Sequence, residues 1–284
     1  MSKRPHLFLL FSLFIWSGCY EPTEGCLSIN AANYNVSADD ACGDCCTFPS
    51  LTLSMQHIAK SSTDSTAFRY GVFYKDPIKV NSLDSFLVDR ARFFISNLKL
   101  ISENDEVVTV IDTLRLGFSD GTTMTIPDNF AKLDRDIFQA RKVGTILSQA
   151  TIKEVQFTVG LEEFLREKEI ISGLPSGHPL ITETDSLVYE AGIGYTSNLL
   201  IVRKDTMPTT DSLIFRYFEP RVIQLPLAAP FTIKRGFNVK LTLRANYLEY
   251  FAGVDFQNDS FQTMQEKISN NLVNVFSVTE IKVE

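Results

Sequence analysis

The sequence predicts an all-β protein, an antiparallel β-sandwich with one or two short helices, and three observations predict it. β-branched and aromatic side chains suit a pleated, half-buried surface, and 22 of the 284 residues are phenylalanine. Short stretches of alternating apolar and polar residues recur along the chain, separated by turn-forming residues. Little helical spacing lies between these stretches, which favours antiparallel strands over a parallel α/β sheet.

Residues 1–18 predict a secretory signal peptide. Lys3 and Arg4 precede an apolar run from Leu7 to Trp16. The run is too short to span a bilayer and has the right length for a signal. It ends in WSGC (residues 16–19), which resembles the lipobox of bacterial lipoproteins. Cys19 would then be the first mature residue and carry the acyl chains that anchor the protein to a membrane. An ordinary cleaved signal with a free Cys19 is the alternative.

Export and net charge together limit the partners that we expect. The signal and the lipobox-like motif predict a lipoprotein of the cell envelope, with the outer membrane as the default and the membrane face left open. Cleavage removes Lys3 and Arg4 and no acidic residue, so the formal charge changes from -7 to -9. This negative charge argues against nucleic acid and against anionic lipid as a partner.

Residues 19–48 predict a short spacer that is held together by disulfides. After Cys19, all the remaining cysteines fall in this segment, and they are Cys26, Cys42, Cys45 and Cys46. An even number of clustered cysteines in an exported chain indicates a disulfide framework, for which three pairings are open. A zinc site is the alternative, but the CxxC spacing of Cys42 and Cys45 has no second pair or nearby histidine beside it.

The same segment, GCLSINAANYNVSADDACGDC, resembles one copy of a repeat of exported proteins from Bacteroidetes-type bacteria, of the form GC…A.NY…A…DDGSC. The positions on this pattern are Gly25, Cys26, Ala31, Asn33, Tyr34, Ala38 and Cys45. The resemblance implies that Cys26 pairs with Cys45, and Cys42 with Cys46. The carboxylate oxygens of three acidic residues in the segment could coordinate calcium, although a solvated acidic loop is the preferred interpretation. These acids are Asp39, Asp40 and Asp44.

Residues 49–284 predict one domain of short strands. The clearest strand is Phe237–Tyr247, in which every second residue is apolar and would face the core. Those residues are Phe237, Val239, Leu241, Leu243, Ala245 and Tyr247. We expect further strands at Leu51–Met55, Leu87–Leu100, Val107–Leu116, Ile152–Val159, Leu187–Tyr189, Asn198–Val202, Leu213–Tyr217 and Arg221–Leu225.

Two segments predict short helices, at Leu161–Lys168 and at Phe261–Phe276. In the second segment apolar residues recur at helical spacing and would face the core. They are Phe261, Met264, Ile268, Leu272 and Val275.

No catalytic motif stands out in the sequence. It contains no GxSxG elbow, no phosphate-binding glycine loop and no HExxH helix. His6 would be lost with the signal, so His57 and His178 would be the histidines of the mature chain, and neither lies near a recognisable nucleophile. We therefore expect a protein that is not an enzyme.

Four stretches, taken in order, resemble the MbnP-like family, a group named for a periplasmic copper-binding protein associated with methanobactin. FLVDRARFFISNLKLIS (86–102) is similar to the family signature, and LTLSMQHIAK (51–60) to its opening strand. VQFTVGLEEF (155–164) and SLVYEAGIGYTSNLLIV (186–202) follow, with Tyr189, Gly194 and Tyr195 on the pattern. The resemblance, which spans roughly residues 50–280, implies a Greek-key-like β-sandwich that is exported, lipid-anchored and not an enzyme.

The best-known members of that family bind copper through histidines and an oxidised tryptophan, which a partner dihaem enzyme makes. The chain has one tryptophan, Trp16, inside the predicted signal, so a tryptophan-derived site is absent from the mature protein. These observations leave two hypotheses for the function. The first is a lipid-anchored binding or structural protein with no cofactor and with an unknown protein or small ligand as partner. The alternative is a periplasm-facing copper-handling protein using His57, His178 and Met55.

Overall fold

The computed structural model describes residues 20–61, 64–75, 85–136, 140–181, 189–190, 192–204 and 211–284. The predicted signal peptide and Cys19 lie outside these residues, as do Leu187 and Val188 of one predicted strand.

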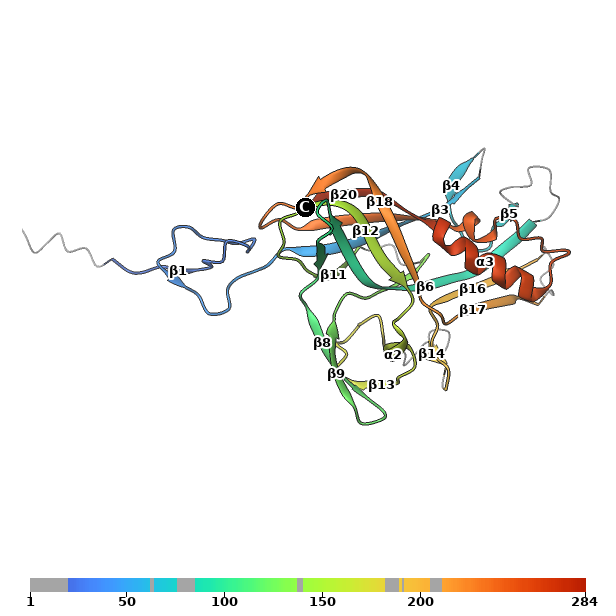
Figure 1. The fold of residues 1–284 in the computed structure, drawn as a ribbon, viewed down its shortest axis with the longest axis horizontal. Helices are drawn as coiled ribbons and strands as arrows, with labels where there is room; N and C mark the ends of the chain where they lie inside the picture. The colour runs from blue at the N-terminus through green and yellow to red at the C-terminus, as the bar shows by residue number, and fades with distance from the viewer. Residues whose placement is uncertain are drawn as a thin grey trace, which may run out of the picture.

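Two β-sheets packed face to face form the body, which confirms the predicted all-β sandwich (Figure 1). In the first sheet the order is β17-β16-β6-β12-β18, and β5, β7 and β10 also pair with β6. Its strands are β5 (Phe73–Lys75), β6 (Ser85–Ser102), β7 (Val107–Thr109), β10 (Ala131–Asp134), β12 (Thr151–Val159), β16 (Asn198–Arg203), β17 (Leu213–Tyr217) and β18 (Arg221–Thr232).

The second sheet has the order β11-β3-β19-β20, with β4 paired to β3. Its strands are β3 (Ser50–Lys60), β4 (Ser65–Ala67), β11 (Arg141–Thr145), β19 (Val239–Asn246) and β20 (Phe276–Val283). Among the strand pairs of the described residues, β3 with β19 and β1 with β2 are parallel, and the rest are antiparallel. The remaining strands are β1 (Glu24–Gly25), β2 (Asp40–Ala41), β8 (Thr113–Phe118), β9 (Thr123–Pro127), β13 (Ile170–Ser172), β14 (Tyr189–Glu190) and β15 (Gly194–Tyr195).

The alternation predicted for β19 is confirmed over most of its length. Val239, Leu241, Leu243 and Ala245 are completely buried between the sheets. Phe237 departs from the prediction, because it lies before the strand begins and is 50% exposed. The stretch predicted as one strand at Val107–Leu116 is divided between β7 and β8, which belong to different sheets.

β6 joins the two halves of the first sheet. The N–H of Phe94 donates to the Ser197 carbonyl (3.1 Å), and its own carbonyl accepts from the Gly160 N–H (2.9 Å). In a strand both backbone groups of one residue point to the same side, so β16 and β12 follow one another along one edge of β6. Gly160 has a φ of 108°, and a Cβ there would lie 2.2 Å from the Ser197 Oγ. A glycine is therefore required at this junction.

The buried side chains form two clusters. The larger lies between the two main sheets and under helix α3 (Phe261–Val275). The smaller lies on the outer face of β6, where Phe94 packs with residues of the β8-β9-β13 sheet and of the one-turn helix α2 (Glu163–Arg166). The elements around this smaller cluster, β8, β9, β13 and α2, form a lobe that lies below the sandwich in Figure 1. No pattern in the sequence predicts this second cluster.

Both predicted helices are present. In α3, Met264, Ile268, Leu272 and Val275 are buried as predicted, whereas Phe261 at its first turn is 44% exposed. A 3-10 helix, η1 (Tyr247–Phe251), follows β19 directly and contributes the buried Tyr247 and Tyr250.

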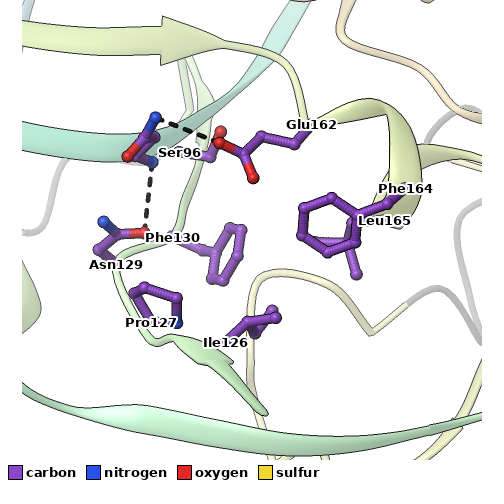
Figure 2. A pocket seen from close by; sticks show the side chains of 9 residues that line it. Ser96, Ile126, Pro127, Asn129, Phe130, Glu162, Phe164 and Leu165 are labelled. Atoms are coloured by element: carbon purple, nitrogen blue, oxygen red, sulfur yellow. Dashed lines mark hydrogen bonds between the residues drawn. The ribbon is translucent and has the colours of Figure 1, made fainter. Parts of the chain in front are cut away.

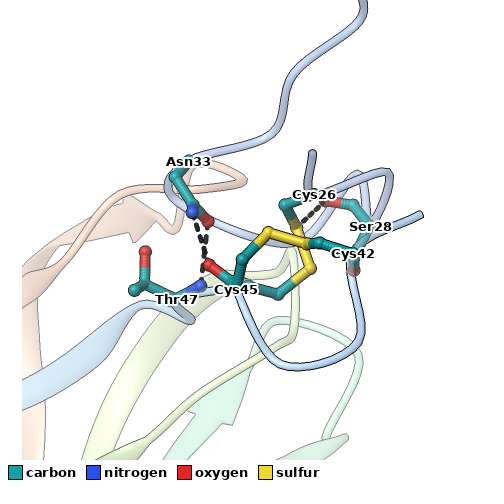
Figure 3. The surroundings of a disulfide bond; sticks show 7 residues. Cys26, Ser28, Asn33, Cys42, Cys45 and Thr47 are labelled. Carbon is teal, nitrogen blue, oxygen red and sulfur yellow. Dashed lines mark hydrogen bonds between the residues drawn. A yellow bond between two sulfur atoms is a disulfide. The ribbon is translucent and has the colours of Figure 1, made fainter. Parts of the chain in front are cut away.

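The cysteine-rich segment carries two disulfides, but the pairing implied by the repeat is wrong. Cys26 pairs with Cys46, and Cys42 with Cys45. The Asn33 side chain fixes the backbone on both sides of Cys46. Its Nδ2 donates to the Cys45 carbonyl (2.7 Å), and its Oδ1 accepts from the Thr47 N–H (2.8 Å) (Figure 3). These two hydrogen bonds hold Cys46 in place for its disulfide with Cys26. Cys45, which directly precedes Cys46, pairs with Cys42 three positions before it.

Candidate functional site

A pocket lies where a bulge in β6 meets the smaller lobe (Figure 2). Its volume is about 70 Å³. Three segments far apart in the sequence form it: β6, the end of β9 with the residues that follow it, and the start of α2. The lining residues are Ser96, Asn97, Ile126, Pro127, Asn129, Phe130, Glu162, Phe164 and Leu165.

Asn97 holds the pocket together through its strained backbone. Its φ is 53°, a left-handed conformation that asparagine tolerates better than most residues. The Asn97 N–H donates to the Asn129 Oδ1 (3.2 Å), and its Nδ2 donates to the Glu162 Oε1 (3.3 Å). The bulge at Asn97 therefore fixes both polar walls of the pocket.

The floor of the pocket is apolar. Ile126, Phe130 and Leu165 are buried, while Phe164 at the rim is 37% exposed. The arrangement can hold one apolar group of side-chain size, with the Glu162 carboxylate available at the edge as an acceptor.

His178 packs beside this pocket, against the outer side of Phe130, with the ring centroids 5.9 Å apart. The Leu180 N–H donates to its Nδ1 (3.2 Å), so the proton of the neutral ring is on Nε2, which lies 3.2 Å from the Asp128 Oδ1. Both ring nitrogens therefore have a partner within the protein, and a metal would have to displace one of them.

His57 and Met55 occupy a different place, on the inner face of β3. His57 is 8% exposed, and its Nδ1 lies 2.8 Å from the Tyr247 hydroxyl, while the two rings stack at 5.6 Å. Burial raises the pKa of that tyrosine well above its usual value. His57 thus contacts the larger core and His178 the smaller cluster. Across the described ranges, no three His, Cys, Asp or Glu side chains are grouped as a metal site.

Of the three acids considered for calcium, Asp39 is used to fix the loop. Its Oδ2 accepts from the N–H (2.9 Å) and the hydroxyl (3.1 Å) of Thr23, and its Oδ1 accepts from the Tyr20 hydroxyl. The Tyr20 hydroxyl, and then the Thr23 N–H, lower the pKa of Asp39 below its usual range. Asp40 and Asp44 are exposed.

The fold and the pocket define an all-β sandwich protein with a disulfide-bonded N-terminal segment. No family model matches the chain, and no curated protein is similar to it. Among solved structures, MbnP from Methylosinus trichosporium is similar at 10% identity over 70% of this chain and 76% of that chain, with a TM-score of 0.38. At this level the likeness carries no conclusion about fold or function, and membership of the MbnP-like family stays a prediction.

In the part of the chain that the structure describes, no helix is both long and apolar enough to span a bilayer.

The sequence does not predict the pocket, because the residues that form it belong to separate segments and fit no functional motif. Asn97 is the one local signal, since asparagine is rare inside strands and this one lies in the middle of a predicted strand.

Proposed function

We propose that this protein is a lipid-anchored binding protein of the cell envelope and not an enzyme. The observation that carries the proposal is the pocket at Asn97, in which a strained residue is held by two side chains from distant segments. Strain of this kind persists where the surrounding structure fixes it and often marks a recognition site. The lipobox-like motif and the disulfides of the N-terminal segment support export and anchoring.

The partner that fits is a protein that inserts one apolar side chain. The pocket is several times smaller than the roughly 300–1,000 Å³ of sites for drug-sized ligands. The lobe that forms it also exposes apolar side chains, as surfaces for protein partners do. These are Met124, Phe164, Ile171 and Ile193.

A photo-crosslinking amino acid at Phe164 tests this site in intact cells. We expect one discrete adduct, because Phe164 stands at the rim of the pocket. The same probe at Val222, which is 57% exposed on β18, is the matched control and should give none. Glu162→Arg should abolish the Phe164 adduct. The proposal fails if both probe positions give the same products or if Glu162→Arg changes nothing.

Anchoring through Cys19 has its own test. The intact mass of protein extracted from membranes should show acyl chains on Cys19, and Cys19→Ala should move the protein to the soluble fraction. The double variant Cys42→Ala/Cys45→Ala is the control, because it also removes cysteines, those of one disulfide, but keeps Cys19 and should stay with the membrane. A mature chain that begins elsewhere would refute lipidation.

Copper handling is the second proposal, and Met55 and His57 support it because they lie two residues apart on one face of β3. The mature protein, purified through a tag without histidine, is loaded with copper and analysed for metal. Stoichiometric copper that is lost in His57→Ala and retained in His178→Ala would favour this function. If the protein retains no copper after desalting, the copper-handling proposal fails and only the proposed binding function remains.

A further inference from the structure

A second cavity lies under α3, away from the pocket at Asn97. The ends of β12, β16, β17 and β18 meet there, and its volume is about 290 Å³. Ser197, Asn198 and Tyr217 form the wall on the sheet side, and Gln265 and Ser269 form the wall on the helix side. Arg221 stands at the exposed mouth.

Asn198 gives the cavity a buried polar group that is not satisfied. The residue is 2% exposed, and its Oδ1 has no hydrogen-bond partner among the described residues. Next to it lies the fully buried Tyr250, whose hydroxyl is adjacent to the Asn198 amide. Burial raises the pKa of Tyr250, and the neighbouring Asn198 amide opposes that rise. Buried polar groups are rarely left unpaired, so an occupant with hydrogen-bonding groups is expected.

The helix presents further polar groups to the same space. Gln265 and Ser269 are four residues apart and so lie on one face of α3. The Tyr217 hydroxyl donates to the Gln265 carbonyl (3.0 Å), which fixes the helix over the sheet. The Arg221 Nη2 lies 3.5 Å from the Ser269 Oγ at the mouth. The cavity therefore combines hydrogen-bond donors and acceptors with the ring of a tyrosine.

The charges around the cavity are mostly compensated. Arg216 pairs with Glu190, and Glu219 pairs with Arg166 (2.8 Å). Arg221 is exposed to solvent. The unpaired buried groups that line the cavity are an acceptor, the Asn198 Oδ1, and a donor, the Arg216 Nε. Such groups match a ligand that offers several hydroxyls and no charge, since each hydroxyl both donates and accepts.

From these observations we infer that the cavity under α3 binds a small uncharged polyhydroxy molecule of monosaccharide size. The volume lies at the lower end of small-molecule sites and far above the roughly 10–15 Å³ that one water needs. Tyr217, which lines the cavity, would supply apolar surface for the carbon side of a sugar ring. This site is independent of the protein-binding pocket at Asn97.

Titration of the purified mature protein tests the inference, with glucose, galactose and N-acetylglucosamine as probes and glutamate as the charged comparison. Calorimetry or ligand-observed NMR monitors the titration. We expect saturable binding at one site for at least one of the sugars. Asn198→Leu, which keeps the shape but removes the amide, should weaken that affinity at least tenfold. Gln224→Leu, at an exposed position of β18 outside the cavity, should leave it unchanged.

Because Asn198→Leu could also disturb folding, Ser269→Trp provides a second variant. It fills the cavity from its half-exposed wall and should abolish sugar binding while the Phe164 crosslink in cells persists. The inference is overturned if no sugar binds, which would leave a cavity that holds water alone. It is equally overturned if glutamate binds in preference to every sugar, or if both cavity variants bind like the wild type.

Discussion

Asp134 is a buried carboxylate held among cations on the first sheet. It is 3% exposed, and its Oδ2 accepts from Arg90 (3.1 Å) and Arg92 (3.0 Å), while its Oδ1 accepts from the Tyr70 hydroxyl (2.9 Å). Burial alone would raise the pKa of Asp134, but hydrogen bonds from the Asp136 N–H and these side chains lower it below its usual value. The charged form is therefore favoured by folding.

Asp134→Asn should lower the free energy of unfolding by about 3 kcal/mol at neutral pH, because it leaves the arginines without their counter-charge. The folded pKa lies below the unfolded value of about 3.9, so this contribution is complete above that value. As the pH falls through the folded pKa, the contribution is lost. Urea denaturation of wild type and variant between pH 3 and pH 7 should show the difference shrinking at the acid end.

The control for this comparison is Asp105→Asn. Asp105 pairs with Lys153 (2.6 Å), but its side chain is 81% exposed, so solvent screens the pair. Asparagine also tolerates the positive φ of this position. A loss of stability as large as that of Asp134→Asn would contradict the role given to burial.

Individual residues were hard to place from the sequence when their partners lie far away in the chain. His57 is a candidate metal ligand because the MbnP-like family, which the sequence resembles, binds copper through histidines. Its contact with Tyr247 joins residues 190 positions apart, and no local pattern reveals it. The same limit applies to Asn97, whose partners come from two other segments.

At the scale of elements, the regularity of the apolar spacing decides what the sequence predicts, as β19 and β20 show. β19 was found because its alternate residues are completely buried, so its apolar spacing is regular. β20 was missed because most of its residues are exposed or half-buried and it follows α3 without a turn. The predicted helix therefore extended one residue into it, to Phe276.

The start of α3 depends on one side chain. The Ser260 Oγ accepts from the Thr263 N–H (3.1 Å), which satisfies one of the free donors of the first turn. Ser260→Ala should cost about 1 kcal/mol of stability, and Ser260→Gly only a few tenths. Thermal or urea denaturation measures both. Ser277→Ala, at an exposed position of β20, is the control, and an equal loss there would argue against a capping role.

At the scale of the whole molecule, the cysteine-rich segment touches the body at few points. All of residues 20–48 are described, and within them Cys26 and Ala31 are the buried apolar residues. Ala31 lies against Gly236, where a Cβ would be 3.0 Å from the Ala31 carbonyl oxygen. The segment therefore owes its order mainly to its disulfides and local hydrogen bonds, and not to either core.

We predict that the cysteine-rich segment can lose its structure while the sandwich stays folded. Cys26 and Cys46 enclose 20 positions of sequence separation, and a crosslink of this length contributes roughly 3 kcal/mol. In the double variant Cys26→Ser/Cys46→Ser, chymotrypsin should cut at Tyr34, which is 45% exposed, at least tenfold faster than in the wild type. The main thermal transition should shift by no more than a few degrees, because the two cores are unchanged.

Trypsin gives the internal control for this experiment. The segment from residue 20 to residue 48 contains no lysine or arginine, so trypsin reports on the body alone and should cleave both proteins at the same rate. If trypsin cleavage accelerates together with chymotrypsin cleavage, the segment and the body unfold as one unit. The boundary predicted near residue 48 would then be wrong, because a segment that opens independently cannot alter the exposure of lysines and arginines in the sandwich.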